Sequence, residues 1–158
     1  MADDGGRAKA KMDELTSRGG LVGAYRLDGR GGGADIDWAA IDDDPLGDKV
    51  HGDIWVHVDR TGSRAKQWIS GGARLPASAA RGLLEPDPRP RFSYFPADDD
   101  TPEGMLFVLR GFNFNEDAAA EDMVSIRMWI DEDRVITSRK RKVMSIDDRR
   151  QALLRGNG

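Results

Sequence analysis

The sequence predicts one domain of mixed α/β or α+β class, and three observations support this prediction. Six stretches rich in β-branched and aromatic residues have the length of strands, and several alternate apolar with polar positions. Helical stretches follow the second and the last of these strands. The chain has 158 residues, which suits a single domain able to bury roughly 70% of its unfolded surface. The expected order is β, β, α, α, β, β, β, β, α, which makes a mixed sheet with helices on at least one face.

The first two strands are expected at 21–27, LVGAYRL, and at 54–59, IWVHVD. The glycine-rich stretch 28–33 lies between them. A phosphate-binding loop would need a Lys-Ser or Lys-Thr pair and a helix directly after it. Here no helix clearly starts and the next residues are acidic, so we expect a flexible loop.

Two short helices are expected next. Ser63 is a suitable N-cap for the first, over 63–70, which stops at the following pair of glycines. Pro76 fits the first turn of the second, over 76–85, which ends before Pro86. Two short helices in succession are expected to lie on one face of the sheet.

The second half of the chain predicts four strands and a helix. An edge-like strand is expected at 91–95 and a nearly all-apolar strand at 105–113, as in a central strand covered on both faces. Strands at 123–130 and 135–139 form a hairpin. A helix then starts with a capping-box pattern at Ser145 and stops at Gly156.

Composition excludes several classes of protein. The formal net charge is −4 and cysteine is absent, so neither disulfides nor thiolate metal sites are expected. No window approaches the ~20 apolar residues that span a bilayer. Residues 1–20 lack the apolar core of a signal peptide and are expected to form a flexible tail before one domain over 21–158. We expect a soluble, cytoplasmic chain.

Clustered acids are the first candidate binding residues. Asp98, Asp99 and Asp100 could contact a hard cation such as magnesium through oxygen atoms. They lack the spacing and the glycine of an EF-hand, so the alternative is a solvated loop. The run at 42–44 is interpreted in the same way. No tightly bound cofactor is expected.

The second candidate is the basic run Arg139, Lys140, Arg141 and Lys142 at the end of the last strand. It could be a solvated or subunit-contacting surface, or a contact for an anion, a lipid headgroup or a nucleic acid. Surfaces for single-stranded nucleic acid usually add stacking aromatic rings, which this run lacks. The acidic net charge also argues against a nucleic-acid partner.

His57 and Asp59 project from one face of the second strand. They could form a proton-handling pair or two metal ligands. Two ligands are too few for a zinc site unless other segments contribute. The alternative is a structural histidine bonded to its neighbours, and no enzymatic activity is expected.

The order of several motifs resembles a known family. GAYRLDGRGGG, IWVHVD, RPRF, LRGFNFN and EDMVSIRMWIDEDRVITSRKRK follow one another, and DDRRQALLRGNG ends the chain. Together they are similar to the cytoplasmic N-terminal domain of the CorA-type divalent metal-ion transporters, with the greatest similarity to the ZntB zinc-transporter branch. The resemblance covers residues 21–158.

This resemblance implies an α/β/α sandwich around a mixed, partly antiparallel sheet. It also implies a homopentameric funnel on the cytoplasmic side of the bacterial inner membrane, joined to the membrane by helices beyond Gly158, where a stalk would begin. Divalent cations, zinc or magnesium, would be the partners, and binding to this domain would be weak. The basic run at 139–142 would lie near the funnel wall. The alternative is a stand-alone regulatory protein that binds anions or nucleic acid through that run.

Overall fold

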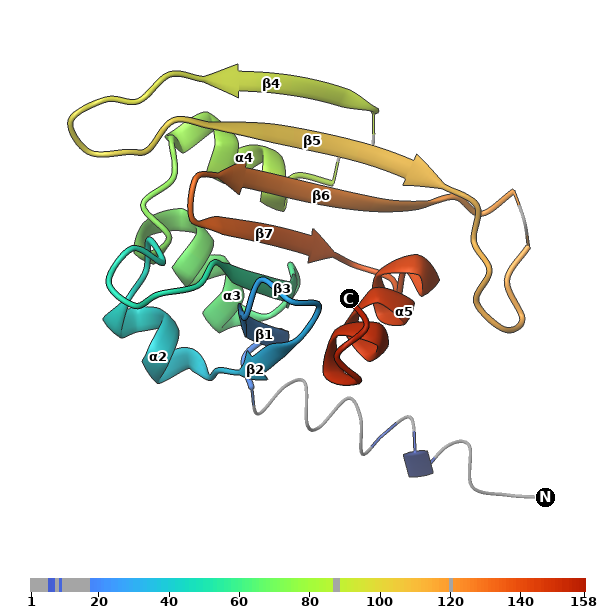
Figure 1. The fold of residues 1–158 in the computed structure, drawn as a ribbon. Coiled ribbons are helices and arrows are strands. Elements are labelled where there is room, and N and C mark those ends of the chain that lie inside the picture. Colours follow the sequence, from blue (N-terminus) through green and yellow to red (C-terminus); the bar gives the residue numbers. More distant parts are fainter. Residues whose placement is uncertain (1–5, 8, 10–17, 87–88, 120) are drawn as a thin grey trace.

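The computed structural model describes residues 6–7, 9, 18–86, 89–119 and 121–158. Its centre is a seven-stranded sheet in the order β2-β1-β3-β7-β6-β5-β4 (Figure 1). The strands are β1 (Leu21–Leu27), β2 (Gly33–Asp35), β3 (Ile54–Asp59), β4 (Arg91–Phe95), β5 (Gly104–Gly111), β6 (Val124–Asp131) and β7 (Arg134–Arg139). Helices are α2 (Trp38–Asp43), α3 (Ser63–Gln67), the π-helical turn η1 (Trp68–Gly72), α4 (Ala77–Leu84) and α5 (Met144–Leu154). The expected tail over 1–20 falls largely outside the described residues.

The predicted fold class is confirmed. The β3–β7 pairing is parallel and the other pairings are antiparallel, so the sheet is mixed as expected. Strands β1, β3 and β4 have the predicted bounds, and β6 and β7 form the predicted hairpin. These are the segments in which β-branched and aromatic residues are concentrated.

Two elements were not predicted from the sequence. The glycine-rich loop leads into the short strand β2. Helix α2 then begins at Trp38, where no helix was expected. Asp37 is the N-cap of α2, and its carboxylate accepts a hydrogen bond from the Ala40 amide at 3.0 Å. The expectation that no helix starts in this acidic stretch failed because an aspartate can itself cap a helix. The run at 42–44 is also not a solvated loop, because Asp44 is buried and pairs with Arg26 at 3.2 Å.

Two predicted helix caps are also wrong. The N-cap of α3 is Gly62, and Ser63 is already helical. The Gly19 carbonyl accepts a hydrogen bond from the Ala65 amide in the first turn of α3 at 2.9 Å. A backbone carbonyl from a distant segment thus takes the place of the expected serine hydroxyl. The N-cap of α5 is Val143, two residues before the predicted Ser145. For α3 a tertiary contact therefore takes the place of the side-chain cap, whereas at the start of α5 the Val143 carbonyl accepts the amides of Ile146 and Asp147 at 3.1 Å.

One face of the sheet is covered by α2, α3, η1 and α4, and this interface is the hydrophobic core. Strand residues such as Val56, Trp129 and Ile136 are 0% exposed there. The opposite face carries α5 near β1 and β2. Arg150 on α5 donates to the Tyr25 hydroxyl at 2.9 Å and to the Val22 carbonyl at 3.1 Å. Helices therefore lie on both sides of the sheet, but the second layer covers only part of its face.

Strand β5 is not the doubly covered central strand that its composition predicted. It lies next to the edge strand β4, and its side chains alternate between buried and exposed. Leu106 and Val108 face the core, whereas Met105 is 36% and Leu109 is 43% exposed. Apolar composition alone could not distinguish a strand that is buried on both faces from a strand that has one exposed face.

A buried ion pair joins the β6–β7 turn to the core. Arg134 Nε donates to Asp131 Oδ2 at 2.7 Å, and the two side chains are 0% and 3% exposed. The same oxygen accepts from Trp129 Nε1 at 2.8 Å, and Arg134 Nη1 donates to the Pro45 carbonyl at 2.6 Å. The pair thus holds two strands, a core tryptophan and the segment after α2 in one arrangement.

We predict that Asp131→Ala lowers the free energy of unfolding by about 3–5 kcal/mol, because it leaves a buried guanidinium without its charge partner. Urea unfolding measures the loss. The control is Asp42→Ala, which removes the pair with Arg64 whose side chains are 46% and 44% exposed. That variant should lose less than about 1 kcal/mol. Equal losses of unfolding free energy in the two variants would contradict the stabilising role of the buried Asp131–Arg134 pair.

Candidate functional site

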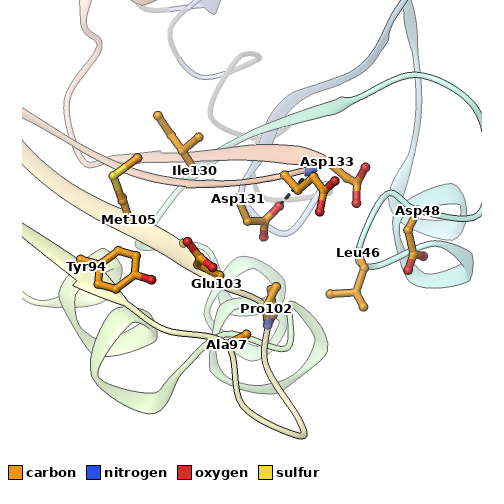
Figure 2. A pocket seen from close by; sticks show the side chains of 12 residues that line it. Leu46, Asp48, Tyr94, Ala97, Pro102, Glu103, Met105, Ile130, Asp131 and Asp133 are labelled. Carbon is orange, nitrogen blue, oxygen red and sulfur yellow. Dashed lines mark hydrogen bonds between the residues drawn. The ribbon is translucent and has the colours of Figure 1, made fainter.

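An acidic cleft of about 620 Å³ opens at the end of the sheet where β4 ends, β5 begins and β6 turns into β7 (Figure 2). Carboxylates and apolar side chains both line it. The acids are Asp48, Glu103, Asp131, Glu132 and Asp133, and the other lining residues are Leu46, Tyr94, Ala97, Pro102, Gly104, Met105 and Ile130. We call these twelve residues the acidic cleft.

Close packing beneath the cleft explains the glycine at the start of β5. Gly104 pairs with Phe95 on one side and Asp131 on the other. A Cβ atom at this position would overlap the ring of Trp129. Glycine therefore lets the indole pass under the cleft and reach Asp131, which links the cleft to the core.

The charges of the acidic cleft are only partly balanced. Asp131 is paired with Arg134, whereas among the described residues no ion pair of Asp133 is found. Partial burial raises the pKa of Asp133, and the neighbouring carboxylates of Glu132, Asp131 and Asp48 raise it further. A hydrogen bond to Glu103 raises the pKa of Tyr94. Such a concentration of negative charge attracts cations or cationic side chains.

The predicted metal residues lie on the rim of this cleft, in the loop between the lining residues Ala97 and Pro102. Asp98 accepts from the amides of Asp100 at 2.9 Å and Thr101 at 2.7 Å, and these bonds lower the pKa of Asp98. Asp98 therefore shapes the loop, while Asp99 and Asp100 point to solvent. Within the described ranges, no group of three His, Asp or Glu side chains is placed to hold a metal ion.

Sequence reasoning missed the deeper acids of the cleft. These acids are Asp48, Glu103, Glu132 and Asp133, which lie in three separate stretches of the chain. The register of β4, β5 and β6 brings these separate segments to one end of the sheet, and the sequence carries no local signal for that meeting.

The basic run at the other end of the sheet does not form one continuous surface. Arg139 is 8% exposed, so its expected place in a solvated run is wrong. Burial lowers the pKa of its guanidinium, and the Asp59 charge opposes this. Lys142 pairs with Asp147 at 3.1 Å, which leaves Lys140 and Arg141 as the exposed members. This arrangement gives no support to a basic stripe for nucleic acid.

His57 is buried rather than placed in an open site. It is 1% exposed, and its Nδ1 lies 2.7 Å from Thr137 Oγ1. Thr137 Oγ1 also accepts from Trp55 Nε1 at 2.9 Å. Desolvation and then the charges of Arg139 and Arg150 lower the pKa of His57 to about 3. Asp59 instead accepts from the Thr61 amide and hydroxyl. This geometry favours the structural role.

We predict that neutral His57 makes stability depend on pH. Because its pKa is lower in the folded state, the unfolded state binds the additional proton, and stability falls as pH drops from 6.5 toward 3. The slope from this one group is at most about 1.4 kcal/mol per pH unit. Chemical unfolding between pH 6.5 and 5 measures it.

His57→Gln should remove this slope. His51→Gln, at an exposed loop position, should keep the wild-type slope. If His57→Gln and the wild type lose stability equally over this pH interval, His57 is not held neutral by burial.

No described helix is both long and apolar enough to cross a membrane.

Comparison with known proteins identifies the family. The profile of the family described as "CorA-like Mg2+ transporter protein" matches residues 51–158, which is more than half of the chain. The chain belongs to this family.

Two named relatives narrow the comparison. The "Divalent cation transporter CmaX" of Pseudomonas aeruginosa is 37% identical over 142 residues, which cover 88% of this chain and 40% of that protein. The structure of the full-length CmaX protein superposes with a TM-score of 0.74 at 35% identity, covering 89% of this chain and 41% of that chain. Most of this chain therefore matches part of a longer protein that is named a divalent cation transporter.

The second relative is the "Zinc transport protein ZntB" of Yersinia pseudotuberculosis, which is 32% identical over 137 residues. The match covers 87% of this chain and 38% of ZntB. The crystal structure of the ZntB cytoplasmic domain from Vibrio parahaemolyticus has a TM-score of 0.67 at 26% identity, over 89% of this chain and 52% of that chain. The chain thus spans about two fifths of the length of these curated relatives.

Proposed function

We propose that this chain forms part of the cytoplasmic domain of a divalent cation transporter in the bacterial inner membrane, with zinc or magnesium as the transported ion. Its role there is to support assembly, regulation and electrostatic guidance of ions, without catalysis. The observation that carries the proposal is the match of 89% of the chain to the ZntB cytoplasmic domain. Family membership and the likeness to CmaX support it.

The distribution of charge supports the guidance role. The acidic cleft lies at the start of β7, and Lys140 and Arg141 lie just beyond its end. Six residues of strand separate the two ends by roughly 20 Å. A cation near this surface meets attraction at one end and repulsion at the other, and salt weakens both effects.

The same charges set the expected strength of ion contacts. Exposed carboxylates that share no coordination geometry attract divalent cations weakly and with little selectivity, whereas tight sites supply six or more oxygen ligands to calcium or nearly octahedral ligands to magnesium. We therefore propose that Asp99 and Asp100, together with Asp98 at the base of their loop, raise the local cation concentration at the rim of the cleft without holding an ion. Assembly of a homopentamer belongs to the same proposal and applies to the full-length protein, with weaker or no association of this chain alone.

The test is ion uptake by the full-length protein in sealed lipid vesicles, with a fluorescent zinc or magnesium indicator inside. We predict uptake well above that of empty vesicles. Lys140→Gln with Arg141→Gln should increase the initial rate by about twofold at low salt, because repulsion of the cation is removed. The increase should disappear near 1 M salt, where the screening length is about 3 Å.

Asp99→Asn with Asp100→Asn is the matched control, since it removes two exposed charges of the opposite sign and should lower the rate at low salt. Absence of uptake of any divalent cation by the wild type would overturn the transporter assignment. Uptake that is the same in all three proteins at low salt would leave transport in place and reject electrostatic guidance.

A further inference from the structure

The acidic cleft is elongated, and apolar side chains lie among its carboxylates. In Figure 2, Tyr94 and Met105 lie at one end of the cleft and Asp48 lies at the other. Leu46 lies between Asp48 and Glu103 in the same view. The volume of about 620 Å³ is within the roughly 300–1,000 Å³ that is usual for small-molecule sites. The cleft therefore has the size and shape to hold an elongated small molecule.

A protein partner needs a larger surface than the cleft provides. Stable protein interfaces usually involve about 20–30 residues on each side, whereas twelve residues line the cleft. These residues converge around a hollow rather than forming a broad face (Figure 2). The size of the site thus favours a small molecule over a second polypeptide.

The charge of the cleft favours a cationic ligand. Among the five acids that line it, only Asp131 has an ion pair with a described residue. The others are Asp48, Glu103, Glu132 and Asp133, and none of the lining residues in the described part of the chain is basic. Carboxylates gathered in a cleft raise the local concentration of cations and repel anions. Charge complementarity therefore identifies the ligand as a cation.

A compact metal ion is a poor match for this arrangement. In the segments that the structure describes, no three His, Asp or Glu side chains are grouped so that they could hold a metal ion. Magnesium requires nearly octahedral oxygen ligands and gives up its bound water reluctantly. Carboxylates that are spaced along a cleft instead match a cation whose charges are also spaced apart.

Linear polyamines have charges of this kind, because short methylene chains separate their ammonium groups. Each ammonium can donate charge-assisted hydrogen bonds to carboxylates such as Glu103 and Asp133. The methylene chains can pack on Leu46 and Met105 and leave water. The ring of Tyr94 adds an aromatic face, which attracts alkylammonium groups. Both the charged and the apolar residues of the cleft then contact the ligand.

We propose that the acidic cleft binds a linear aliphatic polyamine. Its ammonium groups contact Glu103 and the carboxylates of the β6–β7 turn, and its methylene chain lies along Leu46 and Met105. An ammonium beside Asp133 would also oppose the partial burial and the carboxylate repulsion that raise the pKa of this group. The inference does not require ion transport, so it is tested separately from the proposed function.

Isothermal titration calorimetry of the 158-residue chain at 0.15 M salt tests the proposal. The probes are spermidine, putrescine and Mg²⁺, and putrescine and Mg²⁺ carry the same charge. We expect putrescine to bind at least about fivefold more tightly than Mg²⁺, because spaced carboxylates suit its two ammonium groups better than octahedral coordination. Spermidine should bind more tightly again, since it has a further ammonium.

Glu103→Gln with Asp133→Asn should weaken spermidine binding at least about tenfold, because two charge-assisted hydrogen bonds are lost. The matched control is Glu121→Gln with Asp122→Asn, which removes the same charges from the exposed loop before β6. Eight residues of β5 separate this loop from the cleft, roughly 25 Å of strand. The control should change the affinity less than about twofold, since the screening length at this salt is about 8 Å.

Tyr94→Ala tests the apolar part of the site. Spermidine binding should weaken about threefold, because the aromatic face is lost, while Mg²⁺ binding should not change. Circular dichroism and the urea midpoint of each variant confirm that it is folded.

Equal affinities for putrescine and Mg²⁺ would overturn the proposal, and so would equal losses in the two double variants, because attraction by net charge alone gives both results. Unchanged spermidine affinity in Tyr94→Ala would also overturn it, since the ligand would then lie outside the cleft. Spermidine affinity that falls as the protein concentration rises would show that a second copy occupies the cleft, which also contradicts the proposal.

Discussion

The buried pair between Asp131 and Arg134 fixes the part of the molecule on which the rest depends. It closes the β6–β7 turn, receives the indole of Trp129 from the core and holds the segment at Pro45 against the sheet. A pair with so little exposure costs free energy to desolvate, and it is tolerated because hydrogen bonds satisfy most of its atoms. Because the Asp131 carboxylate contacts Arg134 and Trp129, the carboxylates of Glu132 and Asp133 form the more exposed wall of the acidic cleft.

The sheet that this pair helps to hold has two unlike ends and two unlike faces. Negative charge gathers at the β6–β7 turn and positive charge beyond the end of β7, while α2, α3, η1 and α4 close one face and α5 closes part of the other. Among the described residues, the buried His57 has a strongly lowered pKa, and the exposed surface combines clustered charge with apolar side chains.

Much of the fold could be predicted from the sequence, because strands such as β3 and β6 carry their own period and composition. The start of α3 could not, since the distant Gly19 carbonyl rather than a serine side chain accepts the first-turn amide of Ala65. The place of β5 near the edge also escaped prediction, because its apolar composition fits a face covered by the same chain or by another. For the site, Asp98, Asp99 and Asp100 stay a prediction, and the structure places them in the loop at the rim of the cleft. The wall formed by Asp48, Glu103 and Asp133 depends on strand register and has no local signal in the sequence. Arg139 was misplaced because a basic residue at a strand end gives no local sign of burial.

The claim that this chain is one part of a membrane-spanning cation transporter is tested most directly by the genomic sequence downstream of the codon for Gly158. We expect the reading frame to continue into a long helical stretch and then into apolar spans of about 20 residues that cross the bilayer. A stop codon directly after Gly158 would contradict the claim. It would instead favour a stand-alone regulatory protein.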